Sequence, residues 1–301
     1  MLYHVLNRFH LCRWLIILCI PLITSCSSNN YAPQKIQPEA NIPPIRFLLT
    51  FDDGPSGKSR NNPTQKILEV LANNPYQPNI KAIFFTQTRA ARGGGTDIGR
   101  ALLQRENEEG HLLAFHSATK HHDNHRFLAP EELDLSLQRG IQDLTKITGR
   151  APRLVRPPFW SFNSSTFSIY QRHGLEILLT DLSANDGKIY GVNWSWHKRS
   201  NMLKQLARAK QKIIEGGMPV VDGTIPLVVT FHDVNSYTAR NMEVYLGILL
   251  DVAKELDLPL AAKPFYDDRT QLEKAALARR VQDAKGEDYI PGFWGWWWKL
   301  R

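Results

Sequence analysis

Short apolar runs alternate with longer amphipathic stretches along most of the chain, and this alternation limits the fold more than any other feature. Strands that alternate with helices form a parallel sheet with right-handed crossovers. The strand candidates are Ile45–Phe51, Lys81–Thr86, His111–His116, Arg153–Arg156, Glu176–Thr180, Leu227–His232 and Leu258–Ala262. The helix candidates are Thr64–Asn73, Pro130–Thr148, Asn201–Gly216 and Ala239–Leu256.

The alternation fits either a (β/α) barrel or an open doubly wound sheet. Polar residues follow the carboxyl ends of many successive strand candidates. Barrel active sites assemble at that end of the strands. We therefore expect an α/β protein whose single main domain, residues 45–264, is closed like a barrel.

The first 25 residues have the pattern of an export signal. They contain Arg8 and Arg13 but no acid, and the apolar run Trp14–Ile20 follows. This pattern is typical of a cleaved secretory signal, and an uncleaved anchor is the alternative. Ile23–Cys26 resembles a bacterial lipobox, which predicts lipidation of Cys26. Residues 26–44 are rich in Ser, Asn, Pro and Gln and predict a flexible tether.

The predicted anchor places the protein in a bacterial cell envelope. Ser27 and Ser28 lack the acid associated with inner-membrane retention, so we expect the periplasmic side of the outer membrane. The chain has three cysteines, the last of them Cys26. A mature body without further thiols excludes disulfides, Cys-based zinc sites and a Cys nucleophile.

The charge balance is moderately basic. The chain has 37 Lys and Arg against 29 Asp and Glu, and removal of Arg8 and Arg13 leaves a net charge of +6. No basic block interleaved with aromatics indicates nucleic acid as a partner. We expect a monomer.

Residues 265–301 form a tail with a helical piece, Gln271–Lys285, and a Trp-rich run, Phe293–Lys299. We rank packing of the Trp-rich run on the domain above membrane contact. A sugar-stacking platform is a third interpretation.

Two adjacent carboxylates, Asp52 and Asp53, follow the first strand candidate. Like charges at a strand end are costly unless a cation compensates them. One Asp then ligates a metal ion while its neighbour serves as a base. A solvated turn is the alternative, because Asp, Gly and Pro are turn formers.

A second polar motif, His116–His122, follows the strand candidate His111–His116. Its imidazoles and a carboxylate predict a facial His-His-Asp set with open positions for water and substrate. A polar His-rich loop is the alternative.

A third motif contains Arg156, Phe159 and Trp160. The guanidinium holds a carboxylate in place, and the preceding prolines aim the Phe159 amide at a developing oxyanion. Trp160 stacks on a sugar face. A rigid surface loop is the alternative.

The last motifs contain Asp186, which follows one strand candidate, and His232, which ends another. A histidine that is oriented and kept basic by an Asp suits a general acid. A structural histidine is the alternative for His232.

Taken together, these five motifs resemble the NodB-homology polysaccharide deacetylases, also called carbohydrate esterase family four. The resemblance covers about residues 46–262. It implies a distorted (β/α) barrel and metal-dependent removal of acetyl groups from a carbohydrate polymer. It further implies Asp52 as base, Asp53 and two histidines as metal ligands, and Arg156 orienting Asp52. His232 is then the acid, paired with Asp186.

Two departures from the family pattern stand out. The usual motif has histidines four apart, but position 120 is Lys. The second ligand is then His121 or His122, and the five-apart spacing of exported poly-N-acetylglucosamine deacetylases favours His121. Asp186 is followed by Gly187 instead of the usual Trp, which removes one wall of the expected substrate groove.

The resemblance predicts an enzyme that removes N-acetyl groups from an N-acetylglucosamine polysaccharide of the envelope or an exopolysaccharide. The expected cofactor is a divalent metal, zinc by default, with cobalt or nickel as alternatives. The alternative functions are an esterase removing O-acetyl groups, as from xylan, and a non-catalytic carbohydrate-binding lipoprotein. An acid and a base together argue against mere binding.

Overall fold

The computed structural model describes residues 42–186 and 197–284, and its eight strands form one sheet. The strands are β1 (Ile45–Asp52), β2 (Ile83–Gln87), β3 (Leu112–Ser117), β4 (Leu154–Val155), β5 (Glu176–Ile177), β6 (Leu182–Ser183), β7 (Ile225–His232) and β8 (Leu260–Phe265). The helices are α1 (Pro63–Ala72), α2 (Asp97–Glu108), α3 (Pro130–Thr148), α4 (Ser164–Arg172), α5 (Lys198–Ile214), α6 (Ser236–Arg240), α7 (Met242–Glu255) and α8 (Arg269–Ala278).

The strands pair in parallel in the spatial order β5-β4-β3-β2-β1-β7-β6, with β8 beside β1. The long central strands β1 and β7 run in register over their whole length, so Asp52 lies opposite His232. The described residues belong to one compact unit. The fold is a distorted (β/α) barrel in a single domain, as the sequence predicts.

The two faces of the sheet follow from the two-residue period of its strands. Phe47, Leu49 and Phe51 of β1 belong to the larger apolar cluster, together with the apolar sides of α1, α3, α5 and α7. Leu48 lies on the other face in a second cluster, and Thr50 on that face bonds to Thr230 of β7. The outer face is therefore covered by helices, and the inner face becomes polar toward the carboxyl ends of the strands.

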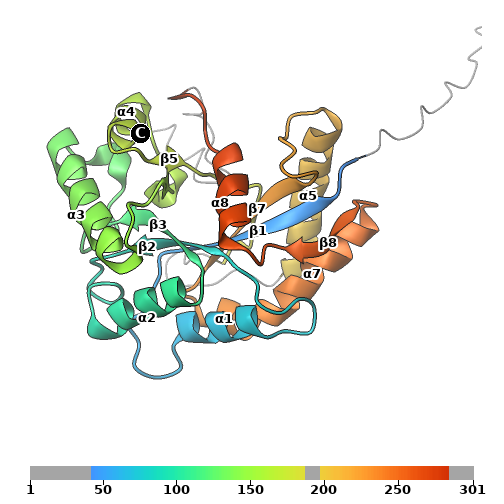
Figure 1. Ribbon diagram of the computed structural model, residues 1–301, viewed down its shortest axis with the longest axis horizontal. Coiled ribbons are helices and arrows are strands. Elements are labelled where there is room, and N and C mark those ends of the chain that lie inside the picture. The colour runs from blue at the N-terminus through green and yellow to red at the C-terminus, as the bar shows by residue number, and fades with distance from the viewer. Residues whose placement is uncertain (1–41, 187–196, 285–301) are drawn as a thin grey trace, which may run out of the picture. The chain divides into compact units, whose positions relative to one another are not determined.

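Helix α8 packs against the inner face. Its Leu272, Ala275 and Ala276 belong to the second cluster with Leu48 and Phe85, and Figure 1 shows the helix in front of the central strands. The predicted tail helix is therefore part of the core. Residues of the predicted tail thus pack against the sheet of the predicted barrel domain.

The predicted strands and helices are present, with ends shifted by a few residues. Strand β6 and helices α2 and α4 were missed, and the predicted helix Ala239–Leu256 is divided at Asn241 into α6 and α7. Strand β6 has two residues, and α2 has a polar sequence interrupted by Gly99. Such segments lack the sustained periodicity on which sequence prediction depends.

No described helix is both long and apolar enough to cross a membrane. The predicted lipidation site Cys26, the tether, Gly187 and the Trp-rich run lie outside the described residues.

Candidate active site

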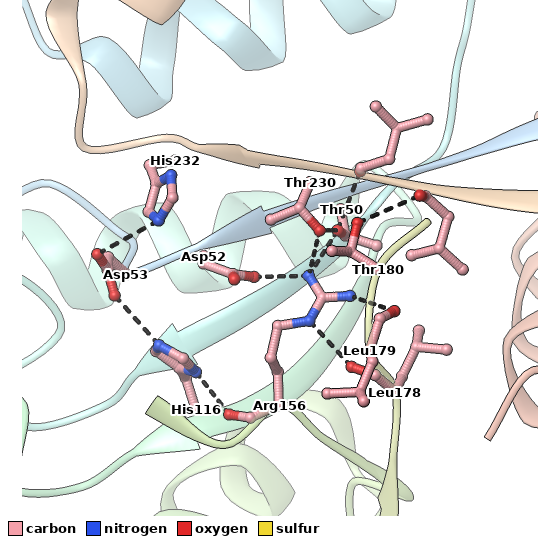
Figure 2. A network of polar contacts seen from close by, with 12 residues as sticks. Thr50, Asp52, Asp53, His116, Arg156, Leu178, Leu179, Thr180, Thr230 and His232 are labelled. Carbon is pink, nitrogen blue, oxygen red and sulfur yellow. Dashed lines mark hydrogen bonds and ion pairs between the residues drawn. The ribbon is translucent and has the colours of Figure 1, made fainter. Parts of the chain in front are cut away.

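The carboxyl ends of β1, β3 and β7 bring the polar motifs together at one edge of the sheet (Figure 2). Asp52 ends β1 and Asp53 follows it, while His116 lies near the end of β3 and His232 ends β7. Arg156 follows β4 and reaches across the interior to Asp52. Segments more than 100 residues apart in the sequence thus contribute to one polar site, as expected for a parallel sheet.

Three side chains form a compact triangle of ligand atoms. Asp53 Oδ1 lies 3.1 Å from His116 Nε2 and 3.2 Å from His122 Nε2, and the two Nε2 atoms are 3.1 Å apart. The three ligand atoms are close enough together to bind one metal ion. Donor atoms on a zinc-type ion with bonds of about 2.0–2.1 Å are separated by roughly 2.9–3.4 Å, so the triangle has the right size for such an ion.

The structure corrects the choice of the second histidine: His122 belongs to the triangle, and His121 is exposed. The reason is the local turn. Ser117 Oγ accepts from Thr119 N, Thr119 Oγ1 accepts from Asp123 N, and His122 adopts the left-handed conformation (φ 51°). This backbone path turns His122 back toward β3, which a count of residues between histidines does not reveal.

The surroundings of His116 prepare its Nε2 atom for a cation. Its Nδ1–H donates to the carbonyl oxygen of Arg156 at 2.7 Å. In the neutral imidazole this bond leaves a lone pair on Nε2, which faces the Asp53 carboxylate and His122. Lone pairs and a carboxylate oxygen that face one another at 3.1–3.2 Å repel unless positive charge lies among them. The donor set therefore fits a divalent metal.

The ionisation of Asp53 agrees with this interpretation. Burial raises the pKa of Asp53, but the adjacent His122, His116 and His232 outweigh burial and hold the pKa well below its ordinary value. Gln87 at the end of β2 donates to the same Oδ1 at 3.1 Å. Burial lowers the pKa of His122, so its imidazole is neutral and able to ligate at neutral pH.

Arg156 is completely buried and satisfied by hydrogen bonds. Its NH1 donates to Asp52 Oδ1 at 2.8 Å and to the hydroxyls of Thr50 and Thr230 at 2.6 and 3.0 Å. Its Nε and NH2 donate to the carbonyl oxygens of Leu178 and Leu179 (Figure 2). The guanidinium therefore fixes the buried Asp52 in one position.

His232 is held by Asp186. Its Nδ1–H donates to Asp186 Oδ1 at 2.7 Å, and its backbone N–H donates to Oδ2 of the same carboxylate. Burial lowers the pKa of His232, but Asp186, with Asp53 and Asp52, outweighs it and raises the pKa to about 10. The Nε2 atom, 3.9 Å from Asp53 Oδ2, therefore carries a proton toward the site at neutral pH.

Phe159 and Trp160 lie in the 3₁₀ turn Pro158–Trp160 with φ angles of 59° and 54°. Left-handed backbone at two bulky residues is strained and concentrates at functional sites. The half-exposed Phe159 ring stacks on His122 at 4.8 Å between ring centroids. No described residue accepts a hydrogen bond from the Phe159 N–H. The Phe159 ring packs against His122, and the Phe159 amide remains available to a ligand.

Sequence analysis missed several supporting residues. Gln87 contacts Asp53, and Thr50 and Thr230 bind Arg156. A signal for the threonines exists, because Thr50-Phe51-Asp52 and Thr230-Phe231-His232 follow one pattern on paired strands. Gln87 has no comparable signal.

Sequence analysis also missed Asp233, the residue after His232, as a partner of the segment that connects β1 to the start of α1. Its Oδ2 accepts from Thr64 Oγ1 at 2.6 Å. A Cβ atom at Gly54 would lie 2.1 Å from the same oxygen, so only glycine fits after the two adjacent carboxylates. Burial raises the pKa of Asp233 to about 7.

Comparison with known proteins agrees with this geometry. Residues 40–178 match the family described as polysaccharide deacetylase. This part of the chain belongs to the polysaccharide deacetylase family. It is the NodB-homology family, carbohydrate esterase family four, that the sequence motifs resemble.

Two curated relatives illustrate the match. A peptidoglycan-N-acetylglucosamine deacetylase of Bacillus cereus is 32% identical over 117 residues, which are 38% of this chain and 36% of that protein. A chitin deacetylase of Pestalotiopsis sp is 27% identical over 143 residues, 48% of this chain and 44% of that protein. The matched segments thus span less than half the length of these relatives.

Solved structures share the fold. The chitin deacetylase of Colletotrichum lindemuthianum superimposes with a TM-score of 0.53 at 19% identity, over 74% of this chain and 87% of that one. A family 4 carbohydrate esterase of Streptomyces lividans, in complex with acetate, superimposes with a TM-score of 0.50 at 22% identity. The superposition covers 73% of this chain and 93% of that one. These likenesses confirm the distorted barrel.

His125 begins a short 3₁₀ turn, His125–Phe127, three residues after His122, and is fully buried. A hydrogen bond of 2.7 Å joins its Nδ1 to the Tyr170 hydroxyl, and its ring stacks near Phe115. Its Nε2 atom has no partner among the described residues. Burial, with the nearby His116 and His122, lowers the pKa of His125 to about 3.

We predict that His125 makes the folded state sensitive to acid. The unfolded chain binds a proton on this histidine below about pH 6.5, but the folded chain binds it only near pH 3, so stability is lost as the pH falls between these values. Between pH 7.5 and pH 5, this residue should lower the free energy of unfolding by about 2 kcal/mol. Urea unfolding with excess chelator should therefore show a flatter pH dependence for His125→Gln than for the wild type.

The matched control is His121→Gln, which changes an exposed histidine. Its pH dependence should equal that of the wild type. An equal dependence in His125→Gln would contradict the burial of a neutral imidazole at position 125.

Proposed function

We propose that this protein is a metal-dependent hydrolase that removes N-acetyl groups from an N-acetylglucosamine-containing polysaccharide. One observation carries the proposal. The Asp53, His116 and His122 triangle lies beside Asp52, a carboxylate fixed by Arg156, and beside His232, a protonated histidine fixed by Asp186. Amide hydrolysis needs a base that activates water and an acid that protonates the departing amine, and both are present beside a candidate metal site.

Asp53, His116 and His122 would hold the metal. A bound divalent ion supplies Lewis acidity, which activates water and polarises the acetyl carbonyl. Zinc is the default because three N and O ligands with open positions are typical of catalytic zinc, and cobalt and nickel suit similar ligands.

Asp52 is the proposed base. Its Oδ1 is held by Arg156, and Oδ2 has no partner among the described residues. This oxygen is available to accept a proton from water. Because Arg156 is buried and bonded on every side, Asp52 keeps its position as it gains and loses that proton.

His232 is the proposed acid. Asp186 holds its Nδ1–H, so the proton on Nε2 is the one directed into the site. The charges of Asp53 and Asp52 contribute to its high pKa. A cation bound by Asp53 weakens that contribution and brings the pKa of His232 closer to the range suited to proton transfer. The Phe159 N–H is the proposed donor to the developing oxyanion.

The metal assignment predicts different effects for the two adjacent histidines. His122→Ala should weaken zinc binding at least tenfold and abolish acetate release, because it removes a ligand atom. His121→Ala should leave both unchanged. Zinc content is measured by elemental analysis. Acetate release is measured from chitin oligosaccharides, peptidoglycan and acetylated xylan, with and without chelator.

Full zinc content in His122→Ala, or loss in His121→Ala alone, would contradict the assignment. Acetate release from xylan alone would replace the proposed N-deacetylase by an O-acetyl esterase. Glycan binding without acetate release from any polymer would indicate a carbohydrate-binding protein.

The role of His232 predicts a dependence on the leaving group. His232→Ala should retain zinc and lower kcat on an N-acetyl substrate by about 100-fold or more. It should change hydrolysis of an aryl acetate far less, because an aryl oxide departs without a proton. Asp186→Asn should show a milder form of the same defect. An equal loss on amide and aryl ester would exclude His232 as the general acid.

We also propose that the protein is exported and anchored by lipid at Cys26, on the periplasmic side of the outer membrane. The lipobox-like Ile23–Cys26 and the preceding basic and apolar segments support this location. Cys26→Ser should abolish incorporation of labelled palmitate and release the protein from the membrane fraction. Labelling that persists in this variant would refute the anchor.

A further inference from the structure

A cleft of about 480 Å³ opens between the first turns of α1 and helix α6. We call it the α1–α6 cleft. Its volume is in the range of small-ligand sites. The residues that define its chemistry are Asn61, Gln65, Lys66, Glu69, Ser236 and Arg240.

The cleft adjoins the candidate active site through the loops that follow β1 and β7. Asp52 and Asp53 lead into the loop that ends at α1, and His232 leads into α6. The Thr64–Asp233 hydrogen bond of 2.6 Å ties α1 to the end of β7. The cleft therefore lies on the same side of the barrel as the carboxyl ends of β1 and β7.

The cleft has an excess of positive charge. Lys66 and Arg240 are exposed, and no described residue forms an ion pair or hydrogen bond with either side-chain cation. Lys58 at the rim donates to Ser236 Oγ at 3.2 Å. The acid in the lining is Glu69, which accepts from Gln65. Two unpaired cations against one carboxylate leave the lining with a net charge of +1.

This lining is suited to an anion more than to a neutral sugar ring. Among the described residues that line the cleft, none is aromatic, so no ring face is available for stacking on a sugar. Arg240 offers a planar fork and Lys66 a point charge, the groups that pair with carboxylates.

We propose that the α1–α6 cleft binds a carboxylate group of an acidic glycan, with Lys66 and Arg240 as its partners. The inference rests on the proposed deacetylase function and deepens it, because it makes the substrate a carboxylate-bearing polymer of N-acetylglucosamine. The carboxylate belongs either to a uronic acid or to the lactyl ether of a muramic acid. Both place one negative charge on a sugar next to N-acetylglucosamine.

The test compares two double variants of equal charge change. Lys66→Gln with Arg240→Gln removes the cations of the cleft. Arg139→Gln with Lys146→Gln removes one Arg and one Lys from the exposed side of α3 and serves as the control. The probes are hyaluronan hexasaccharide, with glucuronate, peptidoglycan glycan strands, with muramic acid, and neutral chitohexaose. Binding to the zinc-loaded protein is measured by calorimetry, and acetate release gives kcat and KM.

The wild type and the control should bind at least one acidic probe more tightly than chitohexaose, and added salt should reduce this difference. The cleft variant should lose about tenfold in affinity for that probe and raise its KM similarly, with unchanged kcat. Its values for chitohexaose should equal those of the wild type. The acidic probe that is affected identifies the source of the carboxylate.

Equal binding of all probes by the wild type would overturn the proposal. So would an unchanged affinity of the cleft variant for both acidic probes, or an equal loss on chitohexaose. Absence of acetate release by the wild type from every probe would refute the proposed function instead. The calorimetric comparison would still decide whether the cleft binds carboxylates. If the double variant of the cleft unfolds, the same measurements are made on the single variants Lys66→Gln and Arg240→Gln.

Discussion

The buried ion pair between Arg156 and Asp52 is the interaction on which the site depends. Taking both charges out of water costs several kcal/mol per ion, and this cost is offset only where the remaining donors and acceptors are satisfied. Here the guanidinium also binds the hydroxyls of Thr50 and Thr230 and two carbonyl oxygens between β5 and β6. It therefore joins the centre of the sheet to the segment between its two end strands, and it fixes the position of Asp52, the proposed base.

The register of β1 and β7 arranges the other groups around this pair. Asp52 lies opposite His232, so the proposed base and the proposed acid are at the same level on adjacent strands. Asp53, one residue later, turns by its left-handed backbone (φ 72°) toward His116 and His122. The end of one strand thus supplies two carboxylates that point toward different partners. The helix-covered outer face and α8 on the inner face keep this edge in place.

The sequence predicts the parts of this arrangement that depend on periodicity and on polar residues at strand ends. These parts are the parallel fold, the long strands, and the closeness of Asp52, Arg156 and His232 in one site. It does not predict features that depend on local backbone geometry or on long-range contacts. The choice between His121 and His122 is decided by a left-handed residue in a turn, and Gln87 is identified only by its contact with Asp53. The short β6 carries too few residues for any pattern.

The distribution of charge connects the site with the α1–α6 cleft. Asp52, Asp53 and Asp186 concentrate negative charge at the carboxyl edge, where Arg156, His232 and the proposed metal balance it. Removal of an N-acetyl group turns a neutral amide into an ammonium ion. The unpaired Lys66 and Arg240 attract the carboxylates of an unreacted acidic polymer and repel a sugar that has become cationic. Under the proposed function, the cleft therefore favours segments of polymer that still carry acetyl groups over those already converted.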